Sequence, residues 1–172
     1  PDSSMEVGAA GYGVQPLAII SETGEFVTGD GRGQIAFWNP ATGEFQKITV
    51  DHGMTSKSVA VSPDSKLIAL GDASQLIVCD RDGREIYVIR NDPDAPMVFG
   101  GNDRDRLKFG GDFSYGRFSP DGKMLALVNS EKPNTIRMLE SATGTPICEI
   151  TGNDRIVRMD FSPDSHHIVA TE

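Results

Sequence analysis

Few residues of this chain are of the types that do chemistry, and their spacing does not gather them into a site. Three histidines are present, His52, His166 and His167, and the last two are adjacent. Adjacent residues of a β-strand point to opposite faces, so we do not expect this pair to ligate one metal ion together. We interpret the pair as solvated turn residues and His52 as a structural turn residue.

The nucleophile candidates are equally isolated. Cys79 and Cys148 have no C-x-x-C partner and no flanking Lys or Arg that would lower a thiol pKa. We therefore expect both to be small buried side chains. No Gly-x-Ser-x-Gly elbow occurs in the sequence. The sequence predicts no catalytic residue, no metal ligand and no cofactor, and we expect the chain not to be an enzyme.

Acidic loops offer one alternative. Asp92 and Asp94 stand two residues apart, as do Asp103 and Asp105, and carboxylates at such a spacing can hold a cation. The ligand count of an EF-hand loop is missing, and the interleaved Arg104 opposes a cation. A cation site is therefore the weaker interpretation of these loops.

The charge balance excludes several classes of partner. The chain of 172 residues carries 16 basic and 25 acidic side chains, a formal net charge of −9. Nucleic-acid backbones and anionic membrane surfaces require a basic footprint, so neither is an expected partner. Residues 1–13 lack the pattern of a signal peptide, and no apolar run has the length of a membrane-spanning helix. We expect a cytoplasmic protein.

A repeat organises the elements that would position any site. Ser-Pro-Asp begins at Ser62, Ser119 and Ser162, and Ser21-Glu22-Thr23-Gly24 is a degenerate copy. The copies are spaced 41, 57 and 43 residues apart, which matches a repeat of about 40–45 residues with one insertion. Pro at the second position and Asp at the third favour a tight turn between two short apolar strands. The second strands lack polar alternation, so we expect them to be buried on both faces, and we expect the Trp38 side chain to be buried as well.

In the first three copies, two further strands follow this pair, and a second turn that carries glycine separates them. The third strands align at residues 34–39, 75–80 and 135–140, and the fourth at 45–50, 85–90 and 146–150. Four short antiparallel strands per period, connected as a meander, make one blade of a β-propeller. The predicted fold class is therefore all-β, with propeller blades in an incomplete ring.

The repeats resemble the WD-repeat family of β-propellers. The third strands end in Trp38-Asn39, Cys79-Asp80 and Leu139-Glu140, at the family's Trp-Asp position, and Asp51-His52 stands where the family has Gly-His. Only one Trp is present, and Arg32 and Ala73 replace a turn Asp that the family often has. The resemblance implies a platform for protein partners, with the family's buried polar network incomplete.

The blade count leaves the ring open. We expect an N-terminal extension over residues 1–13, blades over 14–50, 56–90 and 113–150, and a half blade over 155–172. Closed propellers usually have four to eight blades, and an open half-ring exposes apolar faces and strand edges. We therefore expect further propeller sequence or a complementary chain, a second copy included, to close the ring.

The insertion over residues 91–112 supplies the candidate partner-binding residues. Its two apolar triplets flank a Gly- and Arg-containing stretch that we predict to be a protruding hairpin. The alternative is a decoration that packs Phe99 and Phe109 on the propeller rim. The candidate residues are Met97, Val98, Phe99, Asp103, Arg104, Arg106, Phe109 and, from blade one, Arg32.

Three functions are compatible with these observations. The first is a non-catalytic scaffold for protein–protein interaction. The second is a regulatory or substrate-gating propeller region of a larger enzyme, linked to a peptidase or kinase domain. The third is a propeller enzyme in which acidic side chains hold a metal ion in the central channel.

Overall fold

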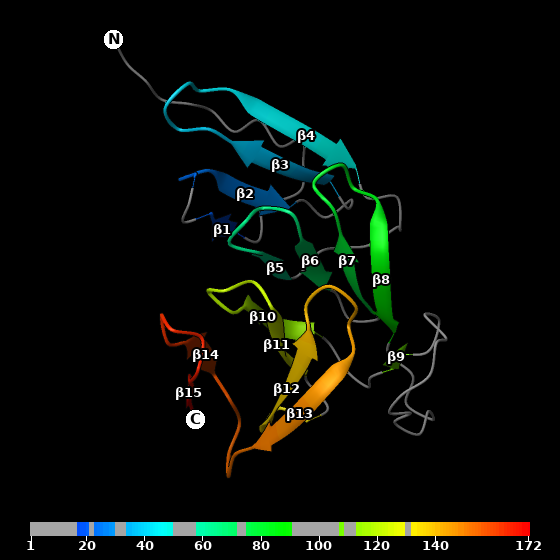
Figure 1. Ribbon diagram of the computed structural model, residues 1–172, viewed down its shortest axis with the longest axis vertical. Coiled ribbons are helices and arrows are strands. Elements are labelled where there is room, and N and C mark those ends of the chain that lie inside the picture. The colour runs from blue at the N-terminus through cyan, green and yellow to red at the C-terminus, as the bar shows by residue number, and fades with distance from the viewer. Residues whose placement is uncertain are drawn as a thin grey trace.

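The computed structural model describes residues 17–20, 23–29, 34–49, 58–71, 75–90, 107–108, 113–129 and 132–172. In these ranges all regular secondary structure is β-strand, arranged as four sheets side by side along an arc (Figure 1). None of the described segments is a helix that could span a membrane.

The four sheets follow each other in sequence order. Blade one consists of β1 (Leu17–Ile19), β2 (Phe26–Gly29), β3 (Gln34–Trp38) and β4 (Phe45–Thr49). Blade two consists of β5 (Ser58–Val61), β6 (Ile68–Gly71), β7 (Gln75–Cys79) and β8 (Glu85–Arg90). Blade three consists of β10 (Phe113–Phe118), β11 (Met124–Asn129), β12 (Thr135–Glu140) and β13 (Pro146–Thr151). Blade four has two described strands, β14 (Arg158–Phe161) and β15 (Ile168–Thr171).

Each blade is a meander in which every strand pairs antiparallel with its neighbour in sequence. The outermost strand of blade two has one addition, because β9 (Leu107–Lys108) pairs parallel with the end of β8. The predicted fold class is confirmed: the chain is all-β and consists of four-stranded propeller blades in an incomplete ring. Of the insertion over residues 91–112 the structure describes only β9, which lies at the outer edge of blade two, and Phe99 and Phe109 lie outside the described residues.

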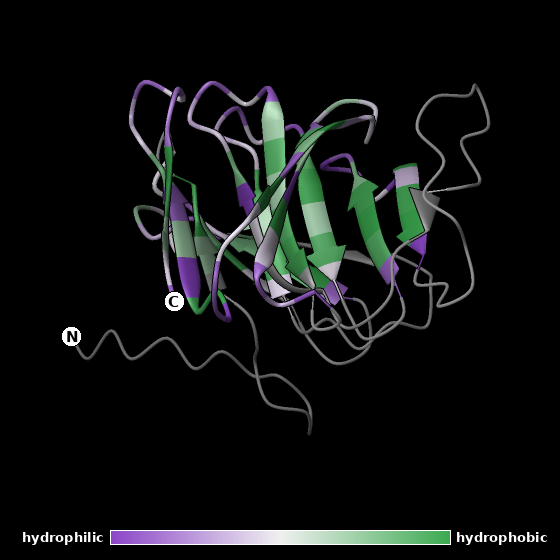
Figure 2. Cartoon of the chain, turned by 90° about the horizontal axis from the view of Figure 1, so that it is seen from below, coloured by the Kyte–Doolittle hydropathy of each residue, from purple (hydrophilic) through white to green (hydrophobic). Residues whose placement is uncertain are grey.

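The hydrophobic core lies between blades rather than within one sheet. The strands that form it are largely hydrophobic (Figure 2). We call the face of a blade toward the preceding blade its leading face and the opposite one its trailing face. Ile35 and Phe37 on the trailing face of blade one pack against Ile68 and Cys79 on the leading face of blade two. Blades two and three, and blades three and four, are joined by similar clusters. Burial of two opposite faces gives each inner sheet its stability.

The second strands show how burial depends on the neighbouring blades. All four residues of β6 are buried, as are residues 125–128 of β11, which confirms the burial predicted from their continuous apolar sequences. In contrast, β15 is largely exposed, with Val169 at 64%. The prediction of burial on both faces is wrong for β15, because no described blade covers its trailing face.

Trp38 also departs from the prediction. It pairs with Phe26, just as Cys79 pairs with Ile68 and Leu139 pairs with Leu125, so Trp38, Cys79 and Leu139 are equivalent leading-face positions. Cys79 and Leu139 are fully buried against the preceding blade, whereas Trp38 is only half-buried. Its predicted burial is wrong, because no described blade precedes blade one.

Candidate functional site

The turns between first and second strands and between third and fourth strands lie on one side of the molecule, which we call the turn side. The turns of successive blades are in contact there. Gly122 in blade three lies beside the Pro63 ring of blade two, and the Asp121 backbone N–H donates to Ser165 Oγ of blade four at 3.0 Å. A continuous surface of polar turns therefore runs across the blades (Figure 2).

The three Ser-Pro-Asp turns share one hydrogen-bond pattern. In blade two, Ser62 Oγ donates to Asp64 Oδ1 at 2.7 Å, and that carboxylate oxygen accepts the Lys66 N–H at 3.1 Å. Ser62 Oγ also accepts the Leu67 N–H at 2.9 Å. The serine and aspartate thus satisfy the turn's backbone donors, as short polar side chains do in such turns.

The same contacts recur in blades three and four. Ser119 donates to Asp121 and Ser162 to Asp164, and each serine oxygen accepts the N–H five residues later. The serine hydroxyls are therefore committed to the turns, and none of the three is arranged as a nucleophile.

The turn carboxylates have lowered pKa values for the same reason. Ser119 Oγ and the Lys123 N–H hydrogen-bond to Asp121 and hold its pKa below the ordinary value. The same two kinds of contact, from Ser162 and the His166 N–H, lower the pKa of Asp164 to about 2. For Asp64, burial raises the pKa, but the hydrogen bonds from Ser62 and Lys66 outweigh it and the net shift is downward.

Blade one has a different turn at the equivalent place. The Ile20 N–H donates to Glu25 O at 2.9 Å, just as the Ser62 N–H donates to Leu67 O. Ile20 therefore holds the position of the turn serine, one residue before the degenerate Ser21 copy expected from the sequence. Ser21 itself lies outside the described residues.

An ion pair joins blades one and two at the turn side. Arg81 Nη2 is 2.7 Å from Glu25 Oε1, and the guanidinium carbon lies 4.4 Å from the centre of the Phe37 ring. The hydrogen bond from Arg81 holds the pKa of the Glu25 carboxyl below its ordinary value. Because Glu25 and Phe37 both belong to blade one, the arginine of blade two fixes the two blades relative to each other.

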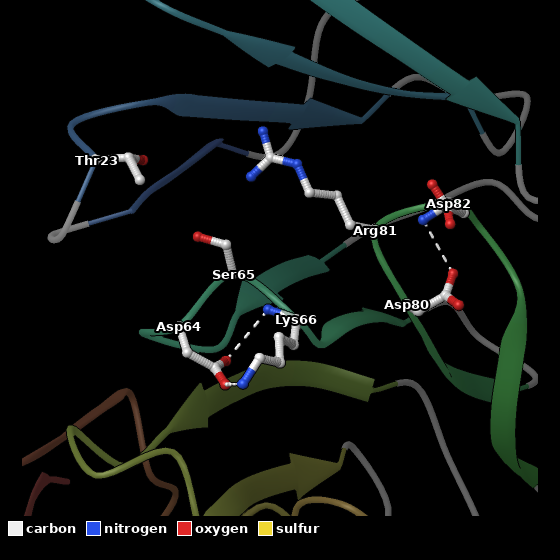
Figure 3. Close-up of a pocket in the computed structure, with 7 residues that line it drawn as sticks. All are labelled: Thr23, Asp64, Ser65, Lys66, Asp80, Arg81 and Asp82. Carbon is white, nitrogen blue, oxygen red and sulfur yellow. Dashed lines mark hydrogen bonds and ion pairs between the residues drawn. The ribbon is translucent and has the colours of Figure 1, made fainter.

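A hollow of about 510 Å³ opens beside this arginine, between the turns of blades one and two (Figure 3). Its lining is polar and of mixed charge, and comprises Thr23, Asp64, Ser65, Lys66, Asp80, Arg81 and Asp82. Most of these groups already have intramolecular partners. Asp80 Oδ1 accepts the N–H groups of Asp82 and Arg84 at 2.9 Å each, and Lys66 Nζ lies 3.1 Å from Asp64.

The hollow offers polar and charged groups for contact with a ligand or a partner. Its lining combines the carboxylates of Asp64, Asp80 and Asp82 with the cationic side chains of Lys66 and Arg81. Exposed charged side chains on rigid turns are typical of a surface that binds another macromolecule.

The eight residues predicted to bind a partner lie outside the described residues. Arg32 falls in the segment 30–33, and Met97, Val98, Phe99, Asp103, Arg104, Arg106 and Phe109 fall in the segments 91–106 and 109–112. His52 also lies outside the described residues. The same holds for the two acidic loops considered for a cation, which contain Asp92, Asp94, Asp103 and Asp105. Their predicted roles stay predictions.

The described histidines and cysteines can be placed. His166 and His167 belong to the Ser-Pro-Asp turn and not to a strand, and the Nδ1 atoms of both lie within 4 Å of the Asp164 carboxylate, at 3.6 and 3.9 Å. Their expected separation on opposite strand faces is thus wrong, although both are exposed turn residues as interpreted.

The two cysteines differ in environment. Cys79 is buried in the blade interface, and desolvation raises its pKa to about 12. Cys148 is exposed on β13, so its predicted burial is wrong. The reason is that β13 is an outer strand and blade four, as described, does not reach across it.

Several contacting residues on the turn side were missed from the sequence. Glu25 and Arg81 are 56 residues apart, and Tyr87, whose hydroxyl donates to Ser141 O of blade three at 3.0 Å, is 54 residues from its partner. Burial raises the pKa of Tyr87. The repeat could have indicated the contact between Arg81 and Glu25, because it places the turn that carries Arg81 in blade two beside the turn that carries Glu25 in blade one.

Comparison with known proteins bears on the fold. No family model and no curated protein sequence matches the chain. Among solved structures, 989 chains match, and one is named Kuenenia stuttgartiensis Hydrazine Synthase. The likeness to that structure has a TM-score of 0.69 at 20% sequence identity and covers 99% of this chain but 45% of the other. This chain thus spans about half the length of that structure.

This likeness corrects one expectation. The chain was expected not to be an enzyme because no catalytic motif was found. A structure named as a synthase has the same fold along 99% of this chain, so the expectation is overturned. Blade strands of an enzyme and of a scaffold carry the same turn and core residues, and the lack of a motif among them does not separate the two.

Proposed function

We propose that this chain is a segment of a larger β-propeller and that its turn side is a binding platform for a protein partner. The observation that carries the proposal is the contact between turns of successive blades. Glu25 with Arg81, Tyr87 with Ser141 and Asp121 with Ser165 each join two blades. A surface held in this way loses little conformational entropy when a partner binds.

The charge of the platform favours a particular kind of partner. Asp64, Asp80 and Asp82 outnumber Lys66 and Arg81 around the hollow, and the whole chain is acidic. Complementary charge increases the rate of association and opposes partners of the same sign. The proposed partner is therefore a protein with a basic surface and not a nucleic acid or an anionic membrane.

The exposed leading face of blade one supports a larger propeller. Ile19 is 61% exposed and Phe45 is 59% exposed, and the Phe45 ring stacks on Trp38 with the ring centres 4.8 Å apart. The equivalent faces of blades two and three are buried by the preceding blade. We propose that a further propeller blade covers this apolar face in the larger protein.

A WD-repeat-like origin is part of the proposal. It rests on the Trp38-Asn39, Cys79-Asp80 and Leu139-Glu140 pairs, because all three lie at the end of the third strand of their blade and begin at equivalent register positions. The cytoplasmic location is a further proposal from the sequence, which fractionation of the producing cells would test.

A second candidate function is a regulatory or substrate-gating propeller region of a larger enzyme. The observation that favours it is the fold likeness to a structure named as a synthase and about twice as long as this chain. In that case the partner of the turn side is another domain of the same protein. Cross-linking at the turn side in the full-length protein separates the two, because the cross-link is intramolecular only for the gating region.

Charge reversal on the turn side tests the platform. Asp82→Lys and Lys66→Glu change exposed turn side chains, and Arg90→Glu changes an exposed residue at the far end of β8 as a matched control. Partners cross-linked to the wild-type protein are identified, and their binding to each variant is then measured. We expect Asp82→Lys to weaken binding of the basic partner, Lys66→Glu to strengthen it, and Arg90→Glu to preserve it. Equal binding by all three would refute the platform.

A further inference from the structure

The outer edge of β15 differs from the corresponding edge in every other blade. β2 pairs with β3, β6 with β7 and β11 with β12, so each of these second strands has a neighbour on both sides. Within the described residues β15 pairs with β14 alone. A strand edge of this kind presents backbone N–H and C=O groups that another strand can bind.

Blade three has an uncovered apolar strip on the trailing face of its outer strand, β13. Cys148 and Ile150 on β13 pair with Met138 and Ile136, just as Tyr87 and Ile89 on β8 pair with Val78 and Leu76. Tyr87 is 4% exposed and Ile89 is fully buried, whereas Ile150 is 43% exposed and Cys148 is also exposed. Equivalent outer-strand positions are therefore covered in blade two and open in blade three.

The residues that cover β8 of blade two show which elements would cover β13 of blade three. Tyr87 and Ile89 pack in one cluster with Leu139 of β12, and the Tyr87 hydroxyl donates to Ser141 O in the turn that follows β12. The inner positions Ile136 and Met138 of blade three are already buried by Met159 and Ile156 of blade four. The uncovered part of the blade-three face is therefore the part that a third and a fourth strand of blade four would cover.

We propose that the β15 edge and the strip of Cys148 and Ile150 bind a two-stranded β-hairpin from a further propeller segment of the same larger protein. The inference rests on the proposed propeller segment. The first strand of the hairpin runs antiparallel to β15 and places an apolar residue opposite Ile168, where Cys79 and Leu139 lie opposite Ile68 and Leu125. Its other apolar side chains cover Ile150.

A second copy of this chain is the less suitable source. All three described hairpins of third and fourth strands, β3–β4, β7–β8 and β12–β13, are already paired inside their own blades. Donating one of them would open a complete blade and expose its core. The fold continues in a chain of about twice this length, which agrees with a source in the same polypeptide.

A fusion tests the proposal directly. Thr171 and Gly71 hold equivalent positions, so a copy of residues 72–90 is attached after Thr171, with Cys79→Ala in the copy to remove its thiol and keep the position apolar. The probe is the rate at which a maleimide labels Cys148. We expect the fusion to label about tenfold more slowly than the chain alone, since a covered thiol reacts only on local opening. Cys148→Ser verifies that the label reports this residue, because Cys79 is buried.

A matched fusion separates docking from mere attachment. Leu76→Pro and Val78→Pro in the attached copy prevent it from forming a strand, and this fusion should label as fast as the chain alone. Amide hydrogen exchange of residues 168–171 gives a second readout, and we expect protection only in the fusion with the intact copy.

Three results would overturn the proposal. The first is equal labelling and equal exchange in both fusions while circular dichroism shows the native sheet content. The second is protection of Cys148 in the chain alone that rises with protein concentration, since it would identify a second copy as the occupant. The third is equal slowing of the label in both fusions. None of these concerns the turn side, so the platform variants Asp82→Lys and Lys66→Glu report on the proposed function independently.

Discussion

Cys79 and Trp38 occupy the same position in adjacent blades, and only Cys79 is covered. Cys79 of blade two is fully buried against blade one, whereas Trp38 of blade one is half-buried and stacks on the exposed Phe45. The difference follows from the neighbouring blade and not from the residue, since the aromatic side chain is the more hydrophobic of the two.

The first prediction compares a covered with an uncovered position. Leu125 is fully buried between blades two and three, so Leu125→Ala should lower the free energy of unfolding by about 2–5 kcal/mol. Trp38→Ala loses a stacking contact and a hydrogen bond to Thr28 on an open face and should cost about 1–2 kcal/mol. Urea denaturation measures both. A larger loss for Trp38→Ala would contradict the open leading face.

A second prediction concerns the ion pair between blades one and two. A double-mutant cycle of Glu25→Gln and Arg81→Met should give a coupling energy of about 0.5–1.5 kcal/mol, because both side chains are largely shielded from solvent. The more exposed pair of Lys66 and Asp64 is the control, and Lys66→Met should change stability by less than about 0.5 kcal/mol. A coupling energy near zero would mean that Arg81 does not fix the blades.

Acid should destabilise the fold through the turn carboxylates. The folded-state pKa values of Asp64, Asp121 and Asp164 lie below the ordinary value, that of Asp164 at about 2. A lowered folded pKa contributes stability above the unfolded pKa of about 3.9, and this stability is lost as the pH falls toward the folded value. Denaturant unfolding between pH 6 and pH 2.5 should show the decline.

Two variants at one turn test this origin. Asp121→Asn removes the titrating group and Ser119→Ala removes its hydrogen-bond donor. Each should reduce the loss of stability between about pH 4 and pH 2.5 while lowering stability at pH 6. An unchanged pH dependence in both variants would exclude Asp121 as a contributor.

The fourth prediction contrasts two serines with the same backbone conformation. Ser65 and Ser165 have φ values of 60° and 63°, a conformation that Gly122 adopts in blade three with φ 72°. Ser65→Gly should raise the free energy of unfolding by about 0.5 kcal/mol, since glycine carries no Cβ penalty there. Ser165→Gly also loses the bond from the Asp121 N–H and should be neutral or destabilising. Equal shifts in melting temperature for the two variants would rule out the inter-blade role of Ser165.

The strands and turns could be predicted from the sequence because their determinants are local. The hydrogen bonds that shape a Ser-Pro-Asp turn join residues two to five apart, so a single tripeptide specifies each turn. The spacing between turns then indicated the order of the strands in a blade. One of these strands, β8, begins and ends at the predicted residues 85 and 90. The all-β propeller architecture follows from that repetition.

Exposure and contact between blades were decided by the tertiary structure. Trp38, Cys148 and Val169 hold strand positions whose equivalents in other blades are buried. Trp38 is only half-buried, and Cys148 and Val169 are exposed, because burial of a blade face requires a second blade. The bond between Arg81 and Glu25 joins residues 56 positions apart. Sequence periodicity records which side chains share a face of a sheet, but only the packing of one sheet on the next determines which face water reaches.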